Sequence, residues 1–190
     1  MEEVLFQKSF YQVWQLQMRA AAAEVQKLNR KLFKDPSLGG ILQSIAKKYE
    51  IEVARFQGEM TAERRTVERQ GQDGWGDYRM IKTTWLDVSI PFVGEAETFR
   101  IAPSSMTVPS KRVRIGRNAL TVSVVDNDGA DSEVQNFKTL VEGNLQILRN
   151  EYQQHKPQLE QAIQQAATQR KAQIDAEDAR DQSRSFRVKN

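Results

Sequence analysis

The stretch that decides the fold is residues 134–163, which read VQNFKTLVEGNLQILRNEYQQHKPQLEQAI. Apolar residues recur through it at helical spacing and so lie on one stripe of a long helix. The members of this stripe are Val134, Phe137, Val141, Leu145, Leu148, Tyr152, Leu159 and Ile163. A single helix over 132–182 would extend about 75 Å. Because a small domain does not need such a length, we expect the stripe to pack on a second long helix or on another copy.

Two residues within this stretch could mark a chemical site or a break. His155 is the only histidine, and in a chain without cysteine only Asp and Glu could join it as metal ligands. Its spacing from Tyr152 and Leu159 places it on the packing stripe, where a polar residue usually sets register or partner choice. Pro157 follows Lys156, which has no side-chain acceptor to cap a new helix. The pattern therefore favours a kinked but continuous helix over two separate helices.

A second long helix is predicted over residues 2–33. Its apolar residues repeat every three or four positions, close to the period of a coiled-coil seam. They are Tyr11, Trp14, Met18, Ala21, Val25, Leu28 and Leu32. Pro36 ends this helix, because proline disfavours helical geometry at the residue before it. A short amphipathic helix is then expected over 38–49.

Between the helices the pattern changes to that of strands. Apolar and polar residues alternate over 51–56, and 78–92 is rich in β-branched and aromatic residues. Residues 113–115 and 120–124 flank a Gly-Arg-Asn turn, which indicates a hairpin. The charged, glycine-rich residues 58–78 predict a loop or a ragged hairpin.

Together these elements predict an α+β protein. Long N- and C-terminal helices frame a small antiparallel sheet, and the two helices are expected to pack in an antiparallel, coiled-coil-like way. The predicted segments are 1–50 for the N-terminal helical part, 51–130 for the β-rich unit, and 131–190 for the C-terminal helix with its basic tail. We expect the three to form one composite domain.

The composition excludes several classes of protein. The 190-residue chain has no cysteine, so disulfides, thiolate nucleophiles and cysteine-ligated zinc are excluded. No apolar run approaches the roughly 20 residues that span a bilayer. The beginning, MEEVLFQ, lacks the apolar core of a signal peptide. These features predict a cytoplasmic protein that does not enter a membrane.

The signatures of common enzymes are also missing from the sequence. It contains no phosphate-binding GK[ST] loop, GxGxxG, GxSxG or HExxH motif. No carboxylates are paired in a way that indicates catalysis, so a carboxylate-dependent hydrolase ranks last. We therefore predict no catalytic residue, no cofactor and no metal site.

A basic segment offers a candidate binding surface. Residues 98–125 contain no acid and five basic residues: Arg100, Lys111, Arg112, Arg114 and Arg117. In a strand, Arg112 and Arg114 would share the face opposite Val113 and Ile115. The aromatic residues that could join them are Trp75, Tyr78 and Trp85. Such a surface could bind phosphate or nucleic acid, or it could be a solvated strand face whose charge prevents edge-to-edge aggregation.

The segment 89–104, SIPFVGEAETFRIAPS, resembles an IPFxGxxxxFxxxPS segment of a family of uncharacterised bacterial proteins. In that family a short β region is followed by a long charged helix. The resemblance runs from Trp85 onward and includes Ile147, Tyr152, Leu159, Arg170, Lys171 and the SFRVKN ending. It implies a bacterial origin and this order of elements, and it brings no activity. Pro157 departs from the family's pattern.

These observations favour a non-enzymatic bacterial subunit that binds a separate effector or enzyme, or another copy, through its helices. The residues predicted to carry the association are Trp14, Met18, Leu28, Leu148, Tyr152, His155 and Leu159. The alternative is a nucleic-acid-binding accessory protein that uses the hairpin 111–117. Its predicted contacts are Arg100, Lys111, Arg112, Arg114 and Arg117.

Overall fold

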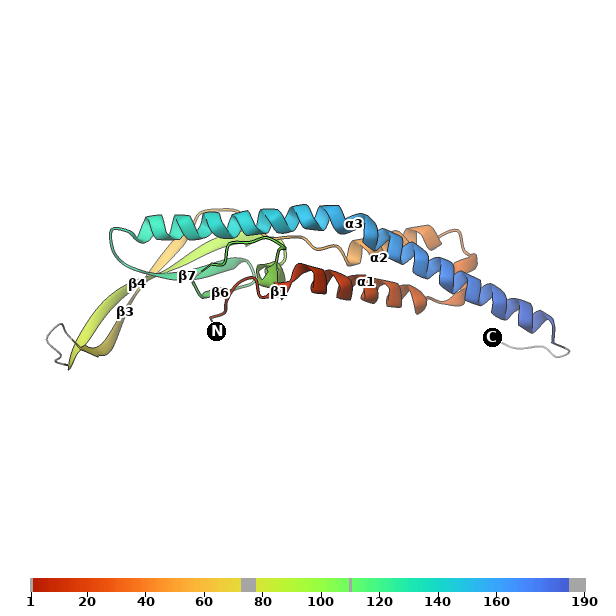
Figure 1. Cartoon of the computed structure of the whole chain (residues 1–190), viewed down its shortest axis with the longest axis horizontal. Helices are drawn as coiled ribbons and strands as arrows, with labels where there is room; N and C mark the ends of the chain where they lie inside the picture. The colour runs from red at the N-terminus through yellow and green to blue at the C-terminus, as the bar shows by residue number, and fades with distance from the viewer. Residues whose placement is uncertain (1, 73–77, 110, 185–190) are drawn as a thin grey trace. The chain divides into compact units, whose positions relative to one another are not determined.

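The structure is a computed structural model that describes residues 2–72, 78–109 and 111–184 (Figure 1). The chain is α+β, as predicted, and divides into two compact units. The sheet unit comprises Met1–Phe10 and Ile51–Glu151, and the helical unit comprises Tyr11–Glu50 and Tyr152–Asn190. Each unit is therefore built from stretches that lie far apart in the sequence, rather than from consecutive segments.

The sheet unit is organised around one long strand, β4 (Tyr78–Val93). Along one edge β4 pairs with β3 (Thr61–Gln72) and with the short β2 (Arg55–Phe56). Along the other edge it pairs with β7 (Ala119–Val125), which in turn pairs with β6 (Val113–Ile115). All four pairings are antiparallel, and the result is a five-stranded sheet.

The sheet has one covered face and one open face. Alternate residues of β7 are buried, as are the β4 residues on the same face, and these include Leu120, Val122, Val124, Val88 and Ile90. The first part of helix α3 (Ala130–Gln182) lies over this face (Figure 1). Its buried residues Val134, Phe137 and Val141 complete the core.

Strand pairing confirms two predictions and decides between the alternatives of a third. Strand β4 and the β6–β7 hairpin form where the sequence predicts them. Of the two alternatives for 58–78, the loop is wrong for Thr61–Gln72, and the hairpin is confirmed, with a regular rather than a ragged strand opposite β4. Pairing along the whole of β3 outweighs its low content of apolar residues. Trp75, named above as a possible aromatic contact, lies outside the described residues.

The start of the chain is extended, so the prediction of a helix from residue 2 is wrong. Helix α1 spans Phe10–Gln26. Before it, Glu3 pairs with Val113, and β1 (Lys8–Ser9) pairs in parallel with β5 (Ile101–Ala102), which follows the 3-10 helix η2 (Ala96–Arg100). Phe6 is buried, with its N–H donating to the Phe99 carbonyl at 2.8 Å. Burial in the sheet unit and these pairings hold residues 2–9 out of the helix.

Within the helical unit, α1 and α3 run in the same direction (Figure 1). The Trp14 and Tyr152 rings meet edge to face, 5.5 Å between centroids. Farther along both helices, the Gln26 amide donates to the Ala166 carbonyl at 3.0 Å. Residue numbers therefore rise together on the two helices, and the prediction of an antiparallel pair is wrong.

Helix α2 (Leu38–Lys48) explains this direction. At its end, Lys48 pairs with Glu24 of α1 at 2.6 Å, so α2 runs antiparallel to α1. The next residue but one, Glu50, pairs with Lys156 of α3 at 2.6 Å. Because α2 returns the chain to the end of the unit where α1 begins, α3 enters there and runs parallel to α1.

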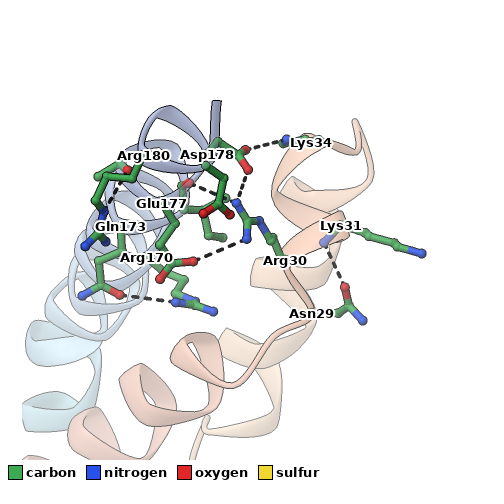
Figure 2. Close-up of polar contacts among 12 residues, drawn as sticks. Asn29, Arg30, Lys31, Lys34, Arg170, Gln173, Glu177, Asp178 and Arg180 are labelled. Carbon is green, nitrogen blue, oxygen red and sulfur yellow. Dashed lines mark hydrogen bonds and ion pairs between the residues drawn. The ribbon is translucent and has the colours of Figure 1, made fainter. Parts of the chain in front are cut away.

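Ion pairs close the far end of the helical unit (Figure 2). The 3-10 helix η1 (Arg30–Lys34) follows α1, and its Arg30 guanidinium donates to Asp178 and to the Ile174 carbonyl of α3. Lys34 pairs with the same carboxylate at 2.7 Å. Lys34, followed by Arg30, holds the pKa of Asp178 below its usual value. The last turns of α3 are thus tied to the end of α1.

Helix α3 is continuous through Pro157, as predicted. Proline has no N–H, so the carbonyl four residues earlier, at Gln153, lacks its helical hydrogen bond. Both residues are exposed. Among the helices of the described residues, none combines the length and apolar character needed to cross a bilayer.

Gly94, which follows β4, has a structural reason to be glycine. Its φ of 97° lies in the left-handed region. A Cβ atom there would come within 2.9 Å of the Glu52 carbonyl oxygen, part of the backbone that pairs beside it. Gly39, inside α2, has no atom within 4 Å of an added Cβ.

We predict that Gly94→Ala lowers the free energy of unfolding by more than about 1 kcal/mol, because strain and overlap add. Gly39→Ala should instead raise it by roughly 0.5–1 kcal/mol, because alanine favours helix. Urea denaturation of both variants measures the two effects. Equal changes in the two variants would contradict this account of Gly94.

Candidate functional site

A basic cleft of about 280 Å³ lies on the open face of the sheet. Its lining residues are Glu2, Arg65, Arg69, Trp85, Lys111, Arg112 and Ser123. Four of the seven are cations and one is an acid, so the cleft is suited to an anionic ligand. We refer to these seven residues as the basic cleft.

Strand register brings the cleft residues together. Arg65 on β3 is directly opposite Trp85 on β4, and opposite residues of an antiparallel pair project from the same face. Arg69 lies four residues farther along β3 and so shares that face. Lys111 and Arg112 come just before β6, on the other side of β7. The cleft therefore depends on the order of strands in the sheet.

Asp87 anchors the basic side chains beside the cleft. It accepts hydrogen bonds from Ser123 Oγ at 2.6 Å, Arg65 Nε at 3.3 Å and Arg114 Nη2 at 3.1 Å. The Ser123 hydroxyl, followed by Arg65, holds the pKa of Asp87 below its usual value. An ionised Asp87 thus fixes Arg65 at the edge of the cleft and neutralises part of its charge.

Two of the four cations lack such a neutralising partner. Lys111 pairs with Glu133 of α3 at 2.5 Å, and Arg65 pairs with Asp87. Arg69 and Arg112 form no ion pair with any described residue, and both are exposed. Within one copy, their charge is therefore not neutralised by an ion pair with a described residue. Trp85 lines the same cleft and is half-buried, so part of its side chain is exposed.

The structure gathers some of the basic residues predicted for nucleic-acid contact and separates others. Lys111 and Arg112 line the cleft, and Arg114 lies beside it through Asp87. As predicted, Arg114 is exposed and its neighbour Val113 is buried. Arg100 is elsewhere, paired with Glu3 at 2.6 Å, and Arg117 is exposed in the turn between β6 and β7.

Sequence reasoning missed Arg65 and Arg69. Both fall in the stretch that predicts a loop or a ragged hairpin, so the sequence assigns neither to a strand face. The alternation of Arg65, Val67 and Arg69 is a weak signal of a strand, since every second residue shares a face. Only the register against β4 shows that this face carries Trp85. The side chain of Tyr78 lies outside the described part of the chain.

The predicted helical stripe lies mostly inside the protein. Trp14, Leu148, Tyr152 and Leu159 are buried, whereas Met18, Leu28 and His155 are half-buried. The His155 ring is 6.3 Å from that of Trp14, and its Nδ1 lies 3.1 Å from the Gln158 side-chain oxygen. Their role in association stays a prediction. Because buried side chains offer no surface to a partner, direct contact would fall to the half-buried three.

A second hollow lies in the helical unit, with a volume of about 610 Å³. It is bordered by α1 and α2, and its apolar residues are Leu28, Ile41 and Ile45. Glu24 and Lys48 at its rim are paired with each other. We refer to this hollow as the helical groove.

Within residues 2–72, 78–109 and 111–184, no three acidic or histidine side chains are grouped so that they could hold a metal ion. Comparisons of the chain with protein-family models, curated proteins and solved structures found no match. Function is therefore inferred from the geometry of the two surfaces described above.

We predict that Asp87→Asn lowers the free energy of unfolding at neutral pH by about 1–3 kcal/mol, because an amide loses charge-assisted hydrogen bonds. A carboxyl whose pKa falls on folding stabilises the folded state above its unfolded pKa, about 3.9 for aspartate. That contribution is lost as the pH falls through the lower folded pKa. The difference between wild type and variant should therefore be full at neutral pH and shrink in acid. Urea denaturation across this range measures it, and a constant difference would refute the role given to ionised Asp87.

Proposed function

We propose that the protein binds single-stranded nucleic acid in the basic cleft. The observation that carries this proposal is the placement of two uncompensated arginines, Arg69 and Arg112, around a half-exposed tryptophan, Trp85. Arginine and lysine bind the phosphate backbone, and an aromatic ring stacks on a base. A single strand can present both groups to one small cleft, because its bases are not already stacked within a duplex.

The alternative explanation is a charged strand that protects the sheet from aggregation. It accounts for the arginines along β3. It does not account for the convergence of residues from β3, β4 and the segment before β6 on one aromatic side chain. Convergent polar groups around a hollow are typical of a binding site.

We predict that Arg112→Glu weakens binding of a fluorescently labelled single-stranded oligonucleotide by about tenfold or more in about 50 mM salt. The dependence of affinity on salt should also become less steep, by about one phosphate contact. Arg19→Glu changes the net charge equally but lies on an exposed position of α1, so it is the matched control. Fluorescence anisotropy at about 50 and 200 mM salt measures both quantities.

A second variant separates stacking from charge. Trp85→Thr keeps a strand-forming residue and should weaken binding by roughly 5- to 150-fold, the range expected for one lost stack. Its salt dependence should match that of the wild type, because no charge is lost. Failure of the wild type to bind at about 50 mM salt would rule out the proposed function.

A second candidate function is suggested by the helical unit. Here the protein is a non-enzymatic subunit of a bacterial assembly that binds a protein partner or another copy through helical surfaces. The open apolar side of the helical groove favours it, as do Leu16 and Tyr11, which are 65% and 63% exposed on α1. This second proposal includes coiled-coil packing of α1 with α3, in the parallel orientation. The cytoplasmic location and the bacterial origin remain predictions.

For this candidate, we predict that Ile41→Glu abolishes association, because it places a charge in the helical groove. Leu16→Glu, on the exposed surface of α1, tests the neighbouring surface. Mass in solution by light scattering, together with co-purification of partners from the host, measures the result. A wild type that is monomeric and purifies alone would remove this candidate.

A further inference from the structure

The outer edge of β3 is a long unpaired strand edge. Among residues 2–72, 78–109 and 111–184, no strand pairs with β3 on the side away from β4. From Thr61 to Gln70 its side chains are exposed, apart from the half-buried Val67. Such an edge presents a row of backbone N–H and C=O groups and is a template for a further strand.

The hairpin that carries this edge is thin over half of its length. Strand β4 pairs with β7 only from Trp85 onward, so residues 66–72 and 78–84 form a two-stranded ribbon beyond the rest of the sheet (Figure 1). A two-stranded ribbon is marginally stable alone, and further strands stabilise it. An added strand would therefore have its largest effect here.

Backbone geometry shows which residues of β3 point outward. The Asp126 N–H donates to the Thr84 carbonyl at 2.9 Å, so the backbone groups of Thr84 face β7. Thr66 is directly opposite Thr84, and its own N–H and C=O therefore point to the open edge. By the alternation of an antiparallel ladder, those of residues 62, 64, 68 and 70 do the same.

We propose that β3 pairs antiparallel with β3 of a second copy, in the register that places Thr66 opposite Thr66. In this register Glu63 faces Arg69 of the second copy, and neither has an ion pair with a described residue of its own copy. Arg64 faces Glu68; within each copy Arg64 already pairs with Asp126 at 2.8 Å and Glu68 with Lys82 at 2.9 Å. By two-fold symmetry each pair occurs twice in the dimer. Both acids of the strand, Glu63 and Glu68, face an arginine, and no like charges are opposite each other. Cross-strand pairs of opposite charge stabilise a sheet, whereas like charges destabilise it.

Neighbouring registers lack this complementarity. A shift of one residue in one direction places Glu63 opposite Glu68, and a shift in the other places Arg64 opposite Arg69. The Thr66-centred register also uses the outward backbone groups and gives roughly ten hydrogen bonds between the two strands. Because each copy uses the same edge, the contact closes as a symmetric dimer and does not propagate.

Cysteine cross-linking tests the register directly, because the chain has no cysteine. Two Thr66 Cα atoms in a hydrogen-bonded pair would lie about 5.5 Å apart, within disulfide range. Thr66→Cys should therefore give a disulfide-linked dimer on mild oxidation. Thr61→Cys is the matched control, since residue 61 of one strand would lie more than about 30 Å from residue 61 of the other. Equal cross-linking of the two variants would overturn the proposed register.

Charge exchange tests the pairing without a cross-link. Glu63→Arg alone and Arg69→Glu alone each place two like-charge pairs in the dimer and should weaken dimerisation by roughly tenfold. Mixing the two variants restores every opposite-charge pair, so a heterodimer should form with near wild-type affinity. Sedimentation across a range of protein concentrations, without nucleic acid, measures each case. If Ile41→Glu abolishes dimerisation and Glu63→Arg leaves it unchanged, the contact lies in the helical groove and not at β3. A monomeric wild type would also overturn the proposed dimer.

Discussion

The pairing of β4 on both of its edges is the constraint on which the sheet unit depends. One edge holds β3 and the other holds β7, and the alternation of side chains along β4 then fixes two faces. Val88 and Ile90 are buried on the covered face, and Trp85 and Asp87 lie on the other. Both the core and the basic cleft therefore follow from one strand and its register. A slip of one residue would exchange these faces.

The helical unit depends on a different constraint, the direction of the chain. Helix α2 is a single return pass between α1 and α3, and one return leaves the outer two helices parallel. Polar contacts at successive levels hold this arrangement, from Glu50 with Lys156 to Arg30 with Asp178. Most apolar residues of the α1 and α3 stripes are buried within the chain. A binding partner would therefore contact the surfaces that remain exposed.

Local patterns in the sequence predicted the elements better than their arrangement. Periodicity, together with composition, turn residues and the missing cap before Pro157, predicted α2, β4, the β6–β7 hairpin and the uninterrupted course of α3, because those signals come from residues near one another. It failed for residues 2–9, whose structure depends on distant partners such as Phe99 and Val113. For β3 it left a loop and a ragged hairpin both open, because the strand has few apolar residues and depends on its pairing with β4. Half of the cleft's cations could not be found for the same reason, since Arg65 and Arg69 depend on register.

The extended start of the chain has a practical consequence for any laboratory preparation. Glu2 lines the basic cleft, and Glu3 is held at the edge of the sheet by its backbone pairing with Val113 and its ion pair with Arg100. Residues fused ahead of Glu2 would thus begin at the rim of the cleft. A polyhistidine tag placed there would bring its own titratable charge to the surface under study.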